Sequence, residues 1–452
     1  MNPPQQLSIS GRTGGIFSAI RGSRTDARLV SLFFVSLVLA GFLSILWINQ
    51  GMFVYTLDDP YIHLAVAEEL AAHGHYGVNS GELSAPCSSP LWPFLMVPFA
   101  GLPHFGLVPF LVSAIAGLAT ALWALGRVRR MLPTPAQGRA GDLLRVGVTL
   151  FFLLATNTIG LVFTGMEHSV QVLLAVLVVE GMLRLADGEK PPKWFDLAVV
   201  MGPWIRYENM ALTLAAVAMF FILGSRPRAL VLGFISACGL LAFSGYLVSL
   251  GLSPVPASIT AKSTFTGAEP VMAALRNLKG SLASGRGMLV ALGASLLVGA
   301  AMLRHVARPW KIAALCVALA GVLHLVAGAY GWVNRYEIYI LAALIWCFGG
   351  VLGMMMKRTG IAPEPASGWA LLPLLPTLGF PYFMGLATLP LASNNIYEQQ
   401  YQMHRFAVDF WGKPVAVNDL GYVSYRNPNY VLDLWGLASP QALKARMANE
   451  AP

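Results

Sequence analysis

The sequence predicts an all-α protein that crosses a membrane many times, and three observations support this fold class. Hydrophobic residues make up 56% of the 452 residues and charged residues only 11%, whereas soluble proteins carry about 25% charge. The mean hydropathy is +0.64. Lys and Arg are absent from residues 30–126 and clustered elsewhere, so the net charge of +9 indicates basic cytoplasmic loops rather than a nucleic-acid partner.

Apolar stretches recur along most of the chain and predict about 11 transmembrane helices. Most are about 17 to 22 residues long, as a bilayer requires, but two half-length stretches lie side by side around a polar tip at residues 206–208. If this pair does not cross the membrane, the count falls by two. The predicted spans are residues 29–48, 107–126, 146–163, 170–186, 195–205, 209–223, 229–250, 287–303, 312–333, 337–356 and 369–390.

The basic residues predict which side of the membrane each loop faces. Residues 1–28 contain four arginines and are typical of a cytoplasmic tail. Further basic clusters follow every second span, as they do in cytoplasmic loops. We therefore expect a cytoplasmic N-terminus and a transmembrane core over residues 29–390, with the C-terminus on the external face. The external segments are then residues 51–106, 251–286 and 391–452.

Each external segment has a pattern of its own. In the first, residues 90–102 are apolar but short and interrupted by prolines, which favours a position in the membrane interface. In the second, residues 270–282 place Leu and Val on one face and bases off it, as an interfacial helix requires. The third predicts a small α/β tail, with a helix at 396–411, strands at 414–418 and 430–434 and a turn at 425–429.

The adjacent acids Asp58 and Asp59 begin the most polar stretch of the first external loop, residues 55–92, which holds five acids and no Lys or Arg. Asp59 precedes Pro60, so its structural explanation is an N-cap, whereas the pattern offers Asp58 no such role. Neighbouring carboxylates repel, and the raised pKa of one suits a general base. Alternatively, a divalent cation binds between them. His63, one turn on, either hydrogen-bonds Asp59 or is an ordinary, partly buried surface histidine.

Other ionisable residues are predicted on the same external side. Glu167 lies where the third span ends, and its structural alternative is an acid that stabilises the start of the next helix. Arg206, Tyr207 and Glu208 form the tip between the two half-length helices. The Arg and Glu could pair simply because an unpaired charge is costly near the membrane, although ionisable groups there are functional candidates by default.

Two bases, Lys262 and Arg335, lie on the side that the positive-inside rule depletes of bases. A phosphate is a natural partner for an ammonium point charge or a guanidinium fork. These features together fit one chemistry: an Asp deprotonates an acceptor hydroxyl, which attacks a sugar whose leaving group is a lipid-linked phosphate. The apolar spans would accommodate the long prenyl chain.

The order of these motifs resembles that of the bacterial GT-C-type integral membrane glycosyltransferases. The closest likeness is to actinobacterial arabinofuranosyltransferases and the related mannosyltransferases that use a polyprenyl-phosphate sugar. The motifs are short, but they run along most of the chain in a consistent order. They are Asp58-Asp59-Pro60-Tyr61-Ile62-His63, Ala67-Glu68, Ser88-Ser89-Pro90-Leu91-Trp92, Gly165-Met166-Glu167, Arg206-Tyr207-Glu208, Ala261-Lys262, Arg335-Tyr336, Asn418-Asp419-Leu420-Gly421 and Asp433-Leu434-Trp435-Gly436-Leu437.

The resemblance implies a GT-C-like fold, a place in the bacterial cytoplasmic (inner) membrane, and inverting sugar transfer on the periplasmic face. It places the general base at Asp58, with Asp59 as helper or second candidate, and Lys262 and Arg335 near the lipid phosphate. The remaining substrate-binding candidates are His63, Glu167, Arg206, Tyr207, Glu208 and Tyr336. It leaves open whether Asp58 and Asp59 hold a divalent cation.

We expect the acceptor to be an envelope glycan, a lipid or a protein. The chain lacks the large external carbohydrate-binding domain of some similar enzymes, so the resemblance does not imply that the acceptor is a cell-wall arabinan. The alternative class is a transporter or flippase of a lipid-linked sugar. That class predicts ionisable groups at the middle of several spans and internal repeat symmetry. The acids here lie instead at the outer ends of spans, and no repeat is evident. A scaffold without activity would tolerate the loss of both aspartates.

Overall fold

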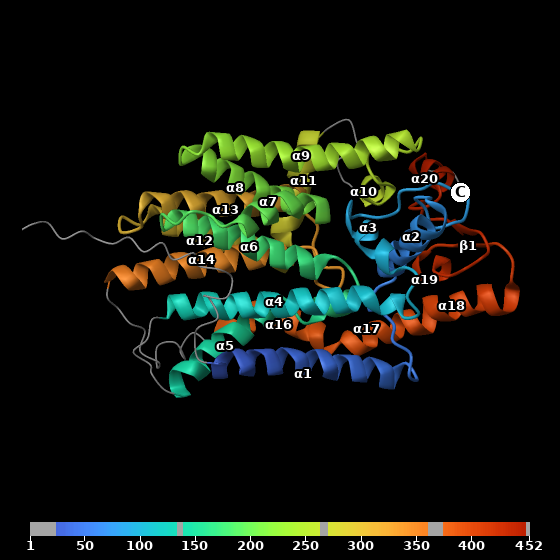
Figure 1. Ribbon diagram of the computed structural model, residues 1–452, viewed down its shortest axis with the longest axis horizontal. Coiled ribbons are helices and arrows are strands. Elements are labelled where there is room, and N and C mark those ends of the chain that lie inside the picture. Colours follow the sequence, from blue (N-terminus) through green and yellow to red (C-terminus); the bar gives the residue numbers. More distant parts are fainter. Residues whose placement is uncertain (1–23, 133–138, 263–269, 360–373, 449–452) are drawn as a thin grey trace, which may run out of the picture.

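Long helices dominate the computed structural model, which describes residues 24–132, 139–262, 270–359 and 374–448. These helices run roughly along the longest axis of the molecule and pack side by side (Figure 1). The longest are α1 (Arg24–Ile48), α4 (Val108–Met131), α5 (Arg139–Ala155), α6 (His168–Ala186), α9 (Arg226–Ser249), α12 (Gly285–Met302), α13 (Arg308–Ala327) and α14 (Ile338–Thr359).

Eight helical segments within the described residues are long and apolar enough to cross a membrane, the third being α5 with the turn that follows it. The predicted helical architecture is thereby confirmed, and the lengths and apolar composition of these helices are compatible with several membrane crossings. The count of eleven stays a prediction, because α7 (Lys193–Ile205) and α8 (Met210–Ile222) have only 13 residues each. The last predicted span falls partly outside the described residues and otherwise on α16 (Leu374–Ala387) and α17 (Leu389–Ile396).

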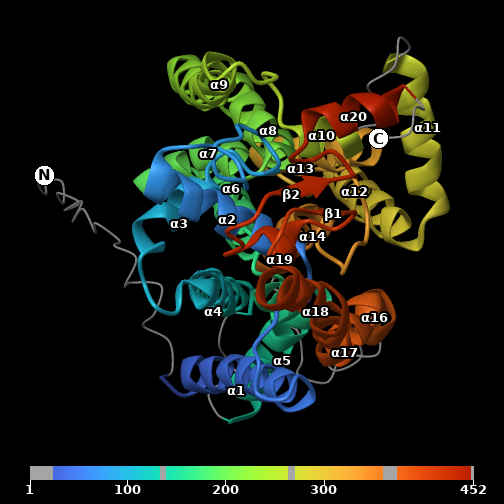
Figure 2. The same ribbon diagram turned by 90° about the vertical axis from the view of Figure 1, so that its right-hand side faces the viewer.

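The two ends of the bundle differ in character. At one end, α4, α6 and α14 finish with Arg or Lys in the last turn, where cations complement the helix dipole. At the other end lie the short elements α2 (Asp59–His73), α3 (Trp92–Met96), α10 (Ala257–Lys262), α19 (Gly421–Ser424) and α20 (Pro440–Met447). Figures 1 and 2 show these elements gathered over that end, hereafter the loop end.

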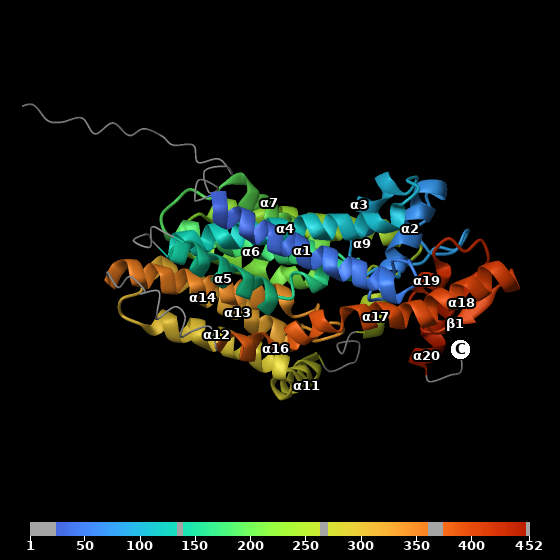
Figure 3. The ribbon, with the colours of Figure 1, turned by 90° about the horizontal axis from the view of Figure 1, so that it is seen from below.

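The C-terminal segment follows the predicted order of helix, strand, turn and strand. From α17 the chain continues without a break through α18 (Gln402–Arg405) to Trp411, with two π-helical stretches (Figure 3). Strands β1 (Val415–Val417) and β2 (Val431–Asp433) pair in parallel, with Ala416 opposite Leu432. The crossover between them contains α19, and this places the first residues of α19 against the start of α2.

The two predicted interfacial segments are also helical. Residues 92–99 form α3 and a 3₁₀ turn, far too short to cross a membrane. The other is α11 (Pro270–Ala283), which leaves Val271, Leu275 and Leu282 exposed. Its opposite side is held to the bundle, because Asn277 donates to the carbonyl of Val326 at 2.8 Å.

A candidate active site at the loop end

The start of α2 is fixed against the membrane bundle by backbone and tyrosine contacts. The Thr56 amide donates to the carbonyl of Phe163 at 3.1 Å, and the buried Tyr55 hydroxyl donates to the Gly106 carbonyl at 2.7 Å. Gly165 has a φ of +63°, and a Cβ there would lie 2.7 Å from the Tyr55 ring. Only glycine therefore fits this turn without strain, which explains the glycine that precedes Met166 and Glu167.

Asp58 joins the first external loop to the C-terminal segment. Its carboxylate accepts hydrogen bonds from the backbone N–H of Gly421 at 2.6 Å and of Tyr422 at 2.7 Å. The ring of Tyr422 packs 4.0 Å from that of Tyr61 on α2. Burial raises the pKa of Asp58 to about 7, against the lowering effect of the two N–H groups. Asp59 and Asp419 raise it further but by less, so burial rather than the neighbouring acid is the main cause.

The helix-cap interpretation of Asp59 is wrong by one residue. Asp58 occupies the N-cap position of α2, without a side-chain hydrogen bond to that helix, and Asp59 is already helical. The Asp59 carboxylate instead accepts a short hydrogen bond from Nη2 of Arg335. The structural role thus falls on Asp58, which we expected to have none, and Asp59 is the partner of the external arginine.

Arg335 is buried, yet its guanidinium is only partly satisfied. The side chain is 1% exposed, and Nη2 also donates to the Tyr336 hydroxyl at 3.0 Å. Among the described residues, its Nε and Nη1 have no hydrogen-bond partner. A buried polar group normally finds a partner, and the free N–H groups of a buried guanidinium are strong donors to the oxygens of a carboxylate or phosphate.

The backbone before Arg335 is held in a left-handed conformation. Gly331, Trp332, Val333 and Asn334 have φ values of 75°, 46°, 61° and 53°. Such a conformation costs about 1–2 kcal/mol for each non-glycine residue and is a true outlier for a β-branched one. Residues held in this way persist only where the surroundings fix them, and they gather at functional sites.

Surrounding polar groups fix this segment from several sides. The Glu337 carboxylate accepts the Gly331 N–H at 2.9 Å, and Arg286 donates to the Asn334 side-chain oxygen at 2.5 Å. The Asn334 carbonyl accepts from the Asn157 side chain at 3.0 Å. Arg286 and Glu337 also form an ion pair at 3.3 Å. The sequence pattern gave no sign of this clamp, because its members lie far apart along the chain.

Arg206 carries the other cationic cluster of the site. It leaves the end of α7 and pairs with Glu167 at 2.6 Å and with Glu208 at 2.6 Å. A longer hydrogen bond of 3.4 Å reaches Ser88 of the first external loop. The Tyr336 ring lies near both guanidiniums, 5.6 Å from the Cζ of Arg206 and 4.9 Å from that of Arg335. The first external loop, the 206–208 tip and Arg335 therefore lie together at the loop end.

His63 is buried at 3% exposure, so its interpretation as a surface histidine is wrong. Burial lowers its pKa, and the charges of Glu167, Asp59, Arg206 and Arg335 all act on it. Its Nδ1 has no hydrogen-bond partner in the described part of the chain. The buried imidazole is thus influenced by two acids and two arginines, and burial disfavours its charged form.

Two further predicted residues are less informative. Tyr207 is half-buried in the 3₁₀ turn after Arg206. Lys262 ends α10, but its side chain lies outside the described residues.

The two aspartates do not face one another as ligands of a shared cation would. Both oxygens of Asp58 accept backbone N–H groups, and Asp59 pairs with a guanidinium. Within the described ranges, no three His, Cys, Asp or Glu side chains gather as metal ligands. Hard cations need several oxygens directed at one point. The residues here therefore do not fit a divalent cation between Asp58 and Asp59.

Comparison with known proteins places only the end of the chain in a family. The model of a domain of unknown function, DUF8728, matches residues 394–451. No curated protein matches the chain. The matched region includes β1, α19 and β2, and thus the N–H groups that bind Asp58.

Proposed function

We propose that the protein is a GT-C-like membrane glycosyltransferase that moves a sugar from a polyprenyl-phosphate donor to an acceptor hydroxyl on the external face. The observation that carries this proposal is the buried Arg335 guanidinium, with two free N–H groups beside the Asp58–Asp59 pair. An external face in the bacterial cytoplasmic membrane agrees with the placement of basic residues at the opposite end of the bundle.

Asp58 serves as the general base in this proposal. A carboxylate with a pKa of about 7 is well matched to proton abstraction near neutral pH. The acceptor hydroxyl loses its proton to Asp58 as its oxygen bonds to the anomeric carbon. The bond from that carbon to the phosphate oxygen breaks with its electron pair, and polyprenyl phosphate leaves. Attack from the opposite side inverts the anomeric configuration.

Arg335 holds the phosphate, and Asp59 positions Arg335. A free donor of this guanidinium would bind a phosphate oxygen and stabilise the charge that grows on the leaving group. Asp59 occupies the third nitrogen and fixes the plane of the guanidinium. The Tyr336 ring lies close to the Arg335 guanidinium. Arg206, whose charge is balanced by two carboxylates, lines the neighbouring part of the site.

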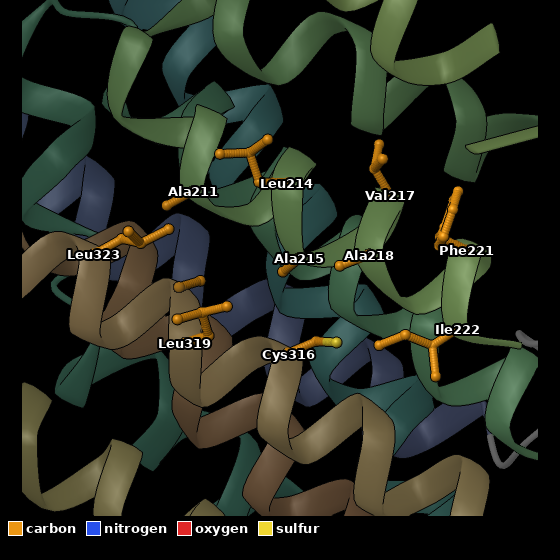
Figure 4. Close-up of a pocket in the computed structure, with 11 residues that line it drawn as sticks. Ala211, Leu214, Ala215, Val217, Ala218, Phe221, Ile222, Cys316, Leu319 and Leu323 are labelled. Atoms are coloured by element: carbon orange, nitrogen blue, oxygen red, sulfur yellow. The ribbon is translucent and has the colours of Figure 1, made fainter. Parts of the chain in front are cut away.

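An apolar groove between α8 and α13 suits the prenyl chain. Its volume is about 410 Å³, and Figure 4 shows aliphatic side chains from both helices along it, including Ala211, Leu323, Leu319 and Ile222. The Ala211 end lies just after the 206–208 tip. Leu323 lies at the same end and adjoins His324, which is linked through the Tyr339 hydroxyl to the Glu208 carbonyl. The groove therefore begins near the 206–208 tip and runs along α8 and α13.

Sugar transfer from a radiolabelled lipid donor in isolated membranes tests the proposal. Asp58→Asn, Asp59→Asn and the double variant should each lose transfer, while expression and detergent extraction stay unchanged. Asp409→Asn is the matched control, because its carboxylate lies on the same end but is 63% exposed in a surface ion pair. Full transfer by the double variant would refute the proposal that the protein is a glycosyltransferase with an aspartate base. Movement of an intact lipid-linked sugar without a new glycosidic bond would instead indicate a flippase.

A further inference from the structure

A polar cavity, separate from the apolar groove, lies at the end of the bundle opposite the candidate active site. Its volume is about 560 Å³, within the range of small-ligand sites. It opens between the last turns of α4, α6 and α14 and the first turn of α13. The charged residues that line it are the bases Arg127, Arg130, Lys357 and Arg358 and the acids Asp187 and Glu189.

Bases outnumber acids beside this cavity. A single carboxylate, Glu180, is fully buried and faces three guanidiniums: Arg130 at 2.6 Å, Arg184 at 3.1 Å and Arg127 at 3.7 Å. The Glu180 oxygen that faces Arg127 also accepts from the Trp346 indole at 3.1 Å. Of the three bases only Arg127 is buried; Arg184 and Arg130 are 19% and 31% exposed, and Arg184 has a second, longer contact of 3.8 Å to Glu189. The buried Arg127 thus shares the Glu180 carboxylate with two other bases, and incomplete compensation of a buried charge is costly.

Two of these guanidiniums also keep free donors. Arg127 is 8% exposed, and its Nε, like Nη2 of Arg130, has no hydrogen-bond partner within the described residues. The first turn of α13 adds to the same surface, with Pro309 and Trp310 in the lining and Ala307, which has no capping side chain, at the N-cap. The unsatisfied N–H groups and the dipole of a helix N-terminus attract anions.

We propose that this cavity binds a phosphate-bearing anion, either the headgroup of an anionic phospholipid or a soluble phosphate. Bases at the ends of α4, α6 and α14 would by themselves follow from the helix dipole and the positive-inside rule. Those rules leave side chains in solvent and do not bury an arginine with a free Nε against a cavity. A phosphate on Arg127 and Arg130 would add negative charge beside the shared carboxylate and accept both free N–H groups, with the exposed Lys357 and Arg358 in the same lining.

Binding to the purified full-length protein in neutral detergent tests this site. Native mass spectrometry with phosphatidylglycerol, against phosphatidylcholine, measures the lipid arm. Calorimetry with inorganic pyrophosphate measures the soluble arm. The test variant is Lys357→Gln with Arg358→Gln, whose side chains are exposed. The control is Arg304→Gln, an exposed base near the start of α13 that does not line the cavity.

The double variant should weaken one arm at least tenfold, while Arg304→Gln leaves both within twofold. A loss confined to phosphatidylglycerol identifies a lipid headgroup, and a loss confined to pyrophosphate identifies a soluble ligand. Equal loss in the control variant, or no selectivity for either anion by the native protein, would overturn the proposal. If the double variant aggregates, Arg127→Lys decides: it keeps the charge but removes Nε, and it should weaken the same arm.

Discussion

The carboxylate of Asp59 accepts a hydrogen bond from Arg335, which lies 276 residues further along the chain. This pair joins the start of α2 to the segment that precedes α14. Because Asp59 is 23% exposed and Arg335 only 1%, the acid faces the outside while the arginine is enclosed. A phosphate that reaches the free Nε and Nη1 of Arg335 would meet a guanidinium whose plane is already fixed.

Replacement of Arg335 by Lys should therefore raise the KM for the lipid donor more than it lowers kcat. An ammonium keeps the charge but cannot provide two coplanar donors while it holds Asp59. We expect a rise of about tenfold to a hundredfold, corresponding to one or two charge-assisted hydrogen bonds. Steady-state transfer with varied donor measures it, and Arg405→Lys at an exposed position is the control. An unchanged KM would remove Arg335 from the phosphate site.

The pH dependence of transfer should report on Asp58. The base works in its ionised form, and the pKa of Asp58 is raised to about 7. The rate at limiting substrate should fall about tenfold per pH unit below 7 and level off above it. A pH–rate profile from 5 to 9 measures this. A rate independent of pH across that range would transfer the role to another group.

The same raised pKa has a consequence for stability. Burial favours the protonated carboxyl in the folded state, so this contribution is complete below the ordinary pKa of about 3.9. It is lost as the pH rises through about 7. Unfolding of Asp58→Asn in detergent should therefore depend less on pH between 4 and 7 than unfolding of the native protein. Parallel curves for the two proteins would contradict the assignment.

Much of this architecture was predictable because it follows from composition along the chain. The length of the apolar stretches and the positions of the basic residues indicate the long apolar helices. Short apolar runs separated by turn residues indicate the two strands near Val415 and Val431. The roles of the two acids were not predictable. The Asp59-Pro60 pair is a good local helix start. In the structure, however, the Asp59 carboxylate accepts a hydrogen bond from the distant Arg335, and the Asp58 carboxylate accepts one from the backbone of α19.

The α19 contact itself can be tested at Gly421. A Cβ at this position would collide with both the carbonyl oxygen and the carboxylate of Asp58. Gly421→Ala should displace the carboxylate and lower transfer at least tenfold, without loss of the folded protein. The control is Gly245→Ala, where the added methyl meets open space. Equal activity of the two variants would show that the position of Asp58 does not matter for transfer.

The left-handed segment before Arg335 should behave as a strained element. Val333→Asn places a residue that tolerates positive φ at 61°, so the free energy of unfolding should rise by about 1 kcal/mol. Chemical denaturation in mixed micelles measures it. Val271→Asn is the control, because Val271 is exposed on the regular helix α11 and gains nothing from the change. A destabilised Val333→Asn would mean that the Val333 side chain compensates for its own backbone.

The clamp on that segment gives the complementary test. Glu337→Gln keeps an acceptor for the Gly331 N–H but loses the ion pair with Arg286. The segment should loosen, and the KM for the donor should rise because Arg335 is no longer held in place. Glu69→Gln removes a carboxylate from a pair with a half-exposed histidine and should leave KM unchanged. An effect of Glu337→Gln on expression alone, with normal KM, would limit the clamp to a structural role.

The Arg206 cluster should contribute mainly to stability. Its ion pair with Glu167 is buried, with side-chain exposures of 6% and 0%, and removal of one partner leaves a buried charge with less compensation. Glu167→Gln should cost about 3 kcal/mol, whereas Asp409→Asn, from an exposed pair, should change stability by less than about 0.5 kcal/mol. Denaturation in mixed micelles compares them. If Glu167→Gln unfolds like the native protein yet loses transfer, Glu167 belongs to the catalytic machinery rather than to the frame around it.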